Sequence, residues 1–404
     1  MTALRSEPLH HAPALTVMRG VAALIILNLH AWRWTAPPEI GEPPALHYLV
    51  STRYIAMPLF FVLSGWVIHY NFSRYLPATG EFALRREAMN YLKFFAKRLV
   101  RLYPLYIVLF GFICYVDDRL FTPPAHWHVF WRYVTLTHSW TFLMIHDLPS
   151  FHSTFSLSWS ISTELALYLS YPVLGFIALR LRDGKRVAMA MAGTLAIAVT
   201  MAEVAVHYRF QFARLVLPDP DERLVNLFAD WFLYCSPWMK VWDFAIGILL
   251  AQFVAVAGRG SVDRLSAPFL HLASVLLLVG LFAGLAYDDL AWSDAAISAL
   301  YQSFAFTPFI ALVLLTAFYR EDLYANSVLL TIGTISYSLY LVHYCVAVGV
   351  WRSESWPEWV AQALLLIGCS VIAAVATYSW IEAPFVRLGR KIRLMPLPES
   401  TDRS

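Results

Sequence analysis

Apolar residues in this chain gather in long uninterrupted runs that are separated by short polar segments. A run of about 20 apolar residues is the length that an α-helix needs to cross a bilayer. The runs are helix-length and do not alternate apolar with polar positions, which argues against a membrane β-barrel. We therefore expect an all-α integral membrane protein built as a bundle of ten transmembrane helices. The predicted spans are 14–34, 52–70, 102–118, 161–181, 187–207, 235–256, 266–286, 296–318, 328–350 and 358–383.

Composition supports lipid as the solvent for most of the chain. The 404 residues are 59% hydrophobic and only 14% charged, whereas soluble domains carry roughly 25% charged residues. The net charge of +3 is small, and basic loops would lie against anionic lipid headgroups. Membrane lipids are therefore expected as partners, and nucleic acid is not.

The polar stretches suggest few further elements. Residues 119–158 are too polar for a clean span, and their Trp, His and Tyr content predicts a loop with an interfacial helix. Its histidines are expected to anchor at the interface rather than to bind a metal; they are His126, His128, His138, His146 and His152. Cysteine spacing supports neither a disulfide framework nor a metal site. The first apolar run has no cleavage site behind it, which favours an uncleaved signal anchor.

Loop charge predicts the orientation, because Lys and Arg concentrate in cytoplasmic loops. With ten spans, the basic loops all fall on one side together with both chain ends, so both termini are expected in the cytoplasm. This divides the chain into an N-terminal segment (1–13), one membrane domain (14–386) and a basic C-terminal tail (387–404). The loop and tail residues are Arg74, Arg85, Arg86, Lys93, Lys97, Arg98, Arg101, Arg182, Lys185, Arg186, Arg387, Arg390, Lys391 and Arg393.

The first span carries two ionisable residues, Arg19 and His30. Eleven positions at 100° each place them within about 20° of the same helix face and about 16 Å apart in depth. Charged groups at such depth should face the protein interior or water rather than lipid, so both residues are expected to face the same cavity. Glu164 in span four is expected at a depth similar to that of His30, where a carboxylate could orient a general base. Arg98 and Arg101 lie at i and i+3, which suits forked phosphate binding.

These residues stand in an order that resembles the acyltransferase-3 family of integral membrane O-acyltransferases. The landmarks span residues 17–390, nearly the whole chain. They are "MRGVAALIILNLHAW" with Arg19 and His30, "LFFVLSGWVI" (59–68), Arg98-x-x-Arg101, "SWSISTE" ending at Glu164, "ISYSLYLVH" (335–343) and "YSWIEAPF" (378–385).

The resemblance implies a bacterial inner-membrane enzyme that moves an acyl group, usually acetyl or succinyl, from cytoplasmic acyl-CoA to a hydroxyl of a glycan or lipid-linked saccharide, or in some members an antibiotic. His30 matches the family's essential histidine and Glu164 its motif acid. Arg19 matches the arginine partner, while Arg98 and Arg101 match a pair associated with the acyl donor. We therefore expect His30 and Glu164 to be catalytic, the three arginines to bind acyl-CoA, and no metal to take part.

The chain departs from the family pattern at a few positions. Leu165 follows Glu164 where a second acid is common, Trp66 replaces a phenylalanine, and Met57 stands where a small or acidic residue is usual. His343 and Glu382 suit helix packing and a cytoplasmic cap, and we leave them out of the catalytic set.

Other mechanisms and functions stay open on the sequence alone. An acyl-enzyme on Ser64, Ser160 or Ser162 is one variant. A transporter or flippase of an acidic or saccharide solute is the alternative function, since buried charges also mark transport paths. A sensor or scaffold without turnover is a third.

Overall fold

The structure is a computed structural model that describes residues 12–37, 44–76, 84–117, 127–145, 148–150, 153–257, 268–287, 304–349 and 353–394. Helices make up nearly all of it. The α-helices are α1 (Pro13–Trp34), α2 (Pro44–Ser51), α3 (Arg53–Phe72), α4 (Leu84–Val116), α5 (Trp127–Val134), α6 (Trp159–Leu179), α7 (Gly184–His207), α8 (Arg209–Val216), α9 (Glu222–Asp230), α10 (Pro237–Val256), α12 (Pro268–Tyr287), α14 (Thr307–Phe318), α15 (Ser327–Val348), α16 (Trp356–Thr377) and α17 (Ala383–Arg390). Two π-helical segments, η6 (Trp231–Cys235) and η8 (Tyr378–Glu382), and the strands β1 (Met144–Ile145) and β2 (Leu148–Pro149) complete the elements used below.

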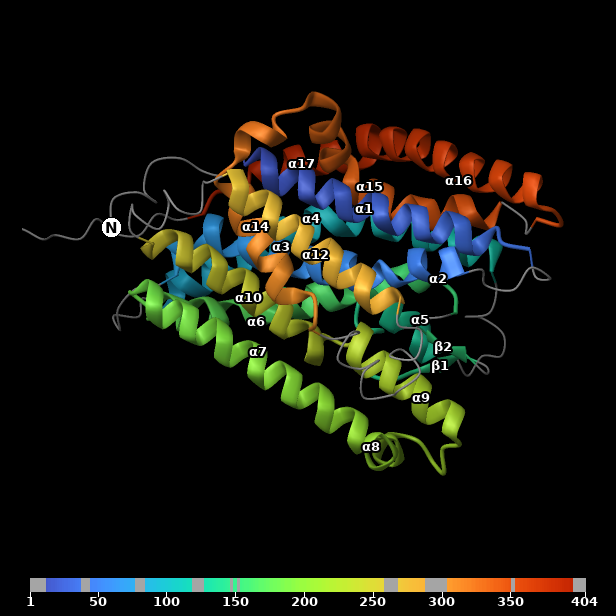
Figure 1. Cartoon of the computed structure of the whole chain (residues 1–404), viewed down its shortest axis with the longest axis horizontal. Coiled ribbons are helices and arrows are strands. Elements are labelled where there is room, and N and C mark those ends of the chain that lie inside the picture. Colours follow the sequence, from blue (N-terminus) through green and yellow to red (C-terminus); the bar gives the residue numbers. More distant parts are fainter. Residues whose placement is uncertain are drawn as a thin grey trace, which may run out of the picture.

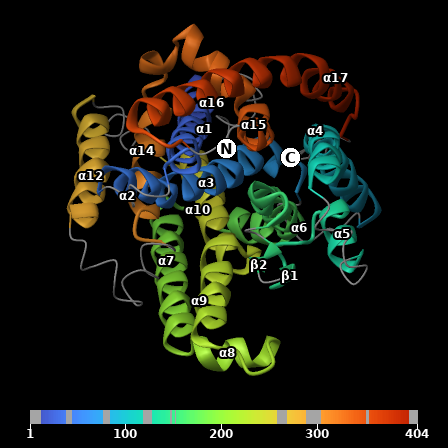
Figure 2. The ribbon, with the colours of Figure 1, turned by 90° about the vertical axis from the view of Figure 1, so that its right-hand side faces the viewer.

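The long helices lie side by side along one axis (Figure 1). The start of α1 and helix α17 lie at one end, and α2, α5 and the β1–β2 hairpin lie at the other. Viewed down this axis, α1, α3 and α15 lie in the middle of the bundle, while α8 lies below it (Figure 2). The middle helices therefore have partners on several sides, and α8 does not.

The prediction of an all-α membrane protein is confirmed. Eight helical segments among the described residues are long and apolar enough to cross a membrane. Two shorter apolar helices, Pro268–Ala283 and Thr307–Phe318, fall on predicted spans seven and eight. The first part of span eight, before residue 304, lies outside the described residues.

Several predicted boundaries were wrong. Helix α4 begins at Leu84 instead of residue 102, because its basic first half is helical although it is not apolar. Arg98 and Arg101 therefore lie well inside α4, and the geometry of this helix sets the direction of their side chains. The segment between predicted spans five and six also folds into α8 and α9, and the hydropathy pattern had predicted no element there.

Glycines allow the middle helices to approach closely. A Cβ on Gly65 of α3 would lie 2.1 Å from the Phe244 carbonyl oxygen of α10, and one on Gly247 would lie 2.0 Å from the Val62 oxygen. A Cβ on Gly333 of α15 would lie 2.1 Å from the Thr16 oxygen of α1. Small residues at such crossings are the usual means by which membrane helices pack backbone to backbone. The α3–α10 and α1–α15 contacts therefore fix the middle of the bundle.

We predict that Gly247→Ala lowers the free energy of unfolding by about 1–3 kcal/mol, the usual effect of overpacking. The added methyl meets backbone atoms of α3, which cannot move aside as a side chain would. Gly193→Ala on α7 is the matched control, because a Cβ there meets nothing within 4 Å. Thermal unfolding in detergent should show a lower Tm for the first variant alone; equal Tm values would refute the close-packing assignment.

The segment from 127 to 158 contains α5 and an antiparallel hairpin in which Met144 pairs with Pro149. Of its two described histidines, His128 is exposed on α5 and His138 is buried. The His138 ring stacks on Tyr133 with 4.1 Å between ring centroids and forms a 3.0 Å hydrogen bond with Ser158 Oγ. Burial lowers the pKa of His138 to about 3, so the imidazole is neutral and holds the segment in place. His126, His146 and His152, residues 1–11 and the tail beyond 394 lie outside the described residues.

Candidate active site

A basic cavity of about 490 Å³ lies between the start of α1, α3, α4 and the η8–α17 segment. Glu382 also lines it; its Oε2 accepts a 2.7 Å hydrogen bond from Ser338, and its Oε1 lies 4.0 Å from Arg101 Nε. Glu382 is therefore a buried member of the cavity and not a cytoplasmic cap. The cations that line the cavity are Arg19, Arg74, Lys97, Arg98, Arg101 and Arg390.

The three arginines selected from the sequence come from two helices and meet here. Arg98 and Arg101 project from one face of α4, and Arg19 of α1 donates from Nη2 to the Gly333 carbonyl oxygen over 3.2 Å. The Arg98 guanidinium lies 5.7 Å from the centroid of the Tyr168 ring. These contacts hold the guanidinium groups at the inner wall, where the basic cavity meets a second one.

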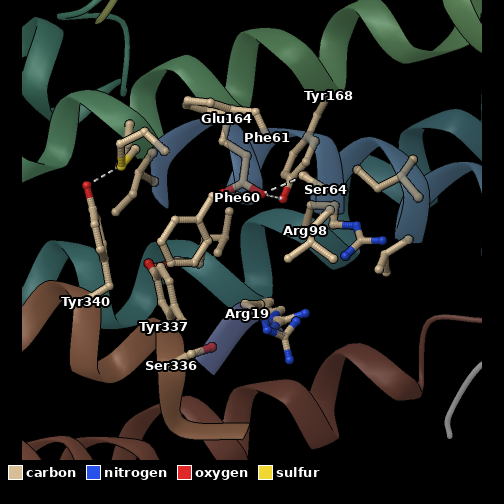
Figure 3. Close-up of a pocket in the computed structure, with 18 of the residues that line it drawn as sticks. Arg19, Phe60, Phe61, Ser64, Arg98, Glu164, Tyr168, Ser336, Tyr337 and Tyr340 are labelled. Atoms are coloured by element: carbon tan, nitrogen blue, oxygen red, sulfur yellow. Dashed lines mark hydrogen bonds between the residues drawn. The ribbon is translucent and has the colours of Figure 1, made fainter. Parts of the chain in front are cut away.

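The second, middle cavity has a volume of about 110 Å³ and shares Arg19, Arg98 and Arg101 with the basic cavity. Glu164 Oε1 accepts hydrogen bonds from Ser64 Oγ, at 3.0 Å, and from Tyr168 (Figure 3). Most of the remaining lining is apolar or aromatic. The middle cavity is thus small and mostly apolar, with one carboxylate in its wall.

The third, histidine cavity has a volume of about 200 Å³ and contains His30. Met57 and Tyr340 line both this cavity and the middle one. The three cavities therefore follow one another along the bundle, from the basic cavity to His30. Arg19 and His30 lie in successive cavities and not in a single one, which corrects the prediction that both face the same cavity.

His30 is held by two rings. Its Nδ1 lies 3.0 Å from Nε2 of His343 on α15, and its ring stacks on Trp34 with 4.2 Å between centroids and an interplanar angle of 3°. His343 is fully buried, and its Nδ1 lies 2.9 Å from the Leu339 carbonyl oxygen. The sequence had not placed His343 in the site, although it ends the motif "ISYSLYLVH".

For two neutral imidazoles, the hydrogen bonds set the tautomers. A carbonyl oxygen only accepts, so Nδ1 of His343 carries the proton and its Nε2 is an acceptor. His30 Nδ1 must then donate to that Nε2, which leaves the lone pair on His30 Nε2. Among the described residues no hydrogen bond occupies this atom. His30 Nε2 therefore carries a free lone pair, on a ring that lines the histidine cavity.

Glu164 does not orient His30. The carboxylate lies in the middle cavity with Ser64 and Tyr168, while His30 pairs with His343. The reason is helix packing, because α6 packs against α10 and α4 whereas α1 packs against α15 and α3. The predicted Glu164–His30 contact was wrong, and the orienting partner is a second histidine.

The fold and these cavities define an integral membrane protein with a half-buried histidine in one of three adjoining cavities, the first of which is lined by cations. Residues 13–379 match the family model described as an acyltransferase domain, and the chain belongs to this acyltransferase-3 family. Acyltransferase MdmB of Streptomyces mycarofaciens is similar, with 25% identity over 420 positions that cover 97% of this chain and 96% of the relative. No solved structure matches the chain. The protein is thus an acyltransferase for groups other than aminoacyl groups, which favours the enzyme over the transporter and the scaffold.

Proposed function

We propose that this acyltransferase takes an acyl group, acetyl or succinyl, from acyl-CoA and transfers it to a hydroxyl of a glycan or other saccharide-containing acceptor, with His30 as general base. The observation that carries the proposal is the succession of three adjoining cavities, from a cationic chamber to one that His30 lines. Each cavity suits one part of such a reaction: the donor phosphates, the pantetheine arm and the acceptor hydroxyl.

The basic cavity suits the phosphates of CoA. Its six cations face one described carboxylate, Glu382, and guanidinium groups bind phosphate oxygens through forked, charge-assisted hydrogen bonds. The middle cavity is small, and Glu164 and Ser64 offer polar groups to the amides of a pantetheine arm. The positive-inside rule then assigns the end of the bundle with α17 to the cytoplasm, in a bacterial inner membrane, where CoA is made available.

His30 carries out the proton transfers of the reaction. Nε2 takes the proton of the acceptor hydroxyl as that oxygen bonds to the acyl carbon; the thioester C–S bond then breaks, and His30 returns the proton to the departing thiolate. The products are the ester and free CoA thiol, and no further reactant is needed. Such general acid–base assistance is worth about 10²–10⁴-fold in rate. Positioning in a small cavity supplies a further part.

Direct transfer is better supported than an acyl-enzyme. Ser64 and Ser160 line the middle cavity, and Ser162 accepts hydrogen bonds from the backbone N–H and hydroxyl of Ser139. Among the described residues, none of these three serines lines the histidine cavity. A serine attack would therefore take place away from the arranged base.

The test is thiol release from acetyl-CoA and succinyl-CoA by the purified protein in detergent, with a panel of neutral and acidic sugars as acceptors. The proposal expects thiol release that rises with acceptor and matches acylated sugar measured by mass spectrometry. If neither donor is consumed with any acceptor, while the protein remains folded, the proposed function is wrong.

His343 is a positioning residue in this scheme, and we predict that His343→Leu lowers kcat about 10²-fold with little change in the KM for acyl-CoA. The loss follows from misplacing the base by a fraction of an ångström to an ångström. His343→Gln, whose Oε1 can replace the Nε2 acceptor, should restore part of the rate. A purely structural role predicts instead that both variants lose folded protein and that the surviving fraction has a normal kcat.

A further inference from the structure

The histidine cavity carries charges that the transfer of a proton does not need. Two arginines and one acid line it, Arg33, Arg53 and Asp230. Around them stand the aromatic residues Trp34, Trp159, Tyr234 and Tyr340. A cation held within a membrane bundle is costly and marks a functional site by default.

Arg53 is held by two tyrosines, and Asp230, the acid in its cavity, forms no ion pair with it among the described residues. Arg53 Nη2 donates a 2.6 Å hydrogen bond to the hydroxyl of Tyr54. Its guanidinium carbon lies 4.7 Å from the ring centroid of Tyr54 and 5.5 Å from that of Tyr234. Nε is enclosed and makes no hydrogen bond, and no ion pair of Arg53 occurs in the described part of the chain. The guanidinium therefore has donors to spare for a ligand.

Arg53 lies away from the two cavities that are assigned to acyl-CoA. Arg53 is the first residue of α3, and Met57, one turn further along, lines both the middle and the histidine cavity. Arg33 lies three residues beyond His30 on α1 and lines the same cavity. Along their helices, Arg33 lies about one turn from His30, and Arg53 lies about one turn from Met57. Neither arginine lines the middle cavity or the basic cavity, to which the donor is assigned.

We infer that Arg53 binds an anionic group, a carboxylate or a phosphate, on the acceptor, so that the substrate is an acidic saccharide whose hydroxyl is presented to His30. This rests on the proposed function and names the class of its acceptor. A guanidinium matches a carboxylate or a phosphate with two parallel hydrogen bonds. The aromatic lining offers flat faces for the apolar side of a sugar ring.

The test measures binding, without turnover. Purified protein in lipid nanodiscs is titrated with D-glucuronate, glucose 1-phosphate and glucose by calorimetry. We expect one or both anionic sugars to bind at least about tenfold tighter than glucose, with the tighter one identifying carboxylate or phosphate as the anion. Arg53→Gln should remove this preference and leave glucose unchanged, whereas Arg53→Lys should retain part of it. Arg132→Gln removes a cation outside the cavity and is the control.

Other outcomes overturn the inference. Equal affinity for charged and neutral sugars in the unaltered protein does so, whatever the variants do. A lower Tm in Arg53→Gln with unchanged anion binding would assign Arg53 to stability, through its contacts with Tyr54 and Tyr234. Slower thiol release from acetyl-CoA with water as acceptor would assign it to the oxyanion. Absence of thiol release from the unaltered protein, with anion binding intact, would refute the proposed function alone.

Discussion

Replacing His30 with alanine should lower kcat for acyl transfer about 10²- to 10⁴-fold, the usual contribution of a general base. The KM for acetyl-CoA should stay within about twofold, because His30 lies in the histidine cavity and the donor phosphates are assigned to the basic cavity. A loss in kcat with unchanged KM indicates an interaction made in the transition state. Initial rates of thiol release with an acidic sugar acceptor provide the measurement.

The control for His30→Ala is His128→Ala, which removes a histidine on α5 that lines none of the described cavities. This variant should keep the rate of the unaltered protein. Near-normal kcat in His30→Ala, with equal amounts of folded protein, would remove the base from the mechanism and leave the His30–His343 pair as a packing contact.

Replacing Arg98 and Arg101 together with alanine should raise the KM for acetyl-CoA about 10²-fold and change kcat much less. Each charge-assisted hydrogen bond to phosphate is worth about 1.5–3 kcal/mol, and 1.4 kcal/mol corresponds to a factor of about ten in affinity. The KM of the unaltered protein should also rise with salt more steeply than that of the double variant, since screening weakens charge pairs at an open cavity.

Arg182→Ala is the matched control for the arginine pair, because it removes a cation near the same end of the bundle without touching the basic cavity. It should leave the KM unchanged. If the double variant retained the KM and the salt dependence of the unaltered protein, the basic cavity would not be the donor site.

The sequence allowed the membrane class to be predicted, because hydropathy marks helices that lipid surrounds. A charged residue within an apolar run must face inward, and this applied to Arg19. Only the family resemblance grouped Arg19 with Arg98 and Arg101 as ligands of the acyl donor, and the structure brings all three to one cavity. The hydropathy pattern does not detect helical segments that are not apolar. It therefore missed the first half of α4 and all of α9.

The partner of His30 could not be found in this way. Periodicity sets the face and depth of a residue on its own helix, but not which helix stands opposite. His343 meets His30 because Gly333 allows α15 to lie directly against α1 at Thr16, a contact between residues more than 300 positions apart in the chain. Glu164 was expected near His30 on depth alone, and the packing of α6 against α4 and α10 directs it to Ser64 instead.

The structure explains why a methionine stands at position 57. The sequence offered none for a methionine at this point of the motif, and the side chain lies where the middle and histidine cavities meet. A pantetheine arm that runs from the arginines to His30 has to pass it. Protection of residue 57 from a chemical reagent by bound acetyl-CoA therefore tests the whole path from the arginines to His30.

The most direct test of that route is the reactivity of a thiol introduced by Met57→Cys, in a variant whose four native cysteines are changed to serine. The alkylation rate is measured with a small maleimide, with and without saturating acetyl-CoA. We predict that acetyl-CoA slows alkylation at least about tenfold, and that adding Arg98→Ala and Arg101→Ala abolishes this protection at the same donor concentration. Alkylation that proceeds equally fast with bound acetyl-CoA would contradict a donor path from the arginines to His30.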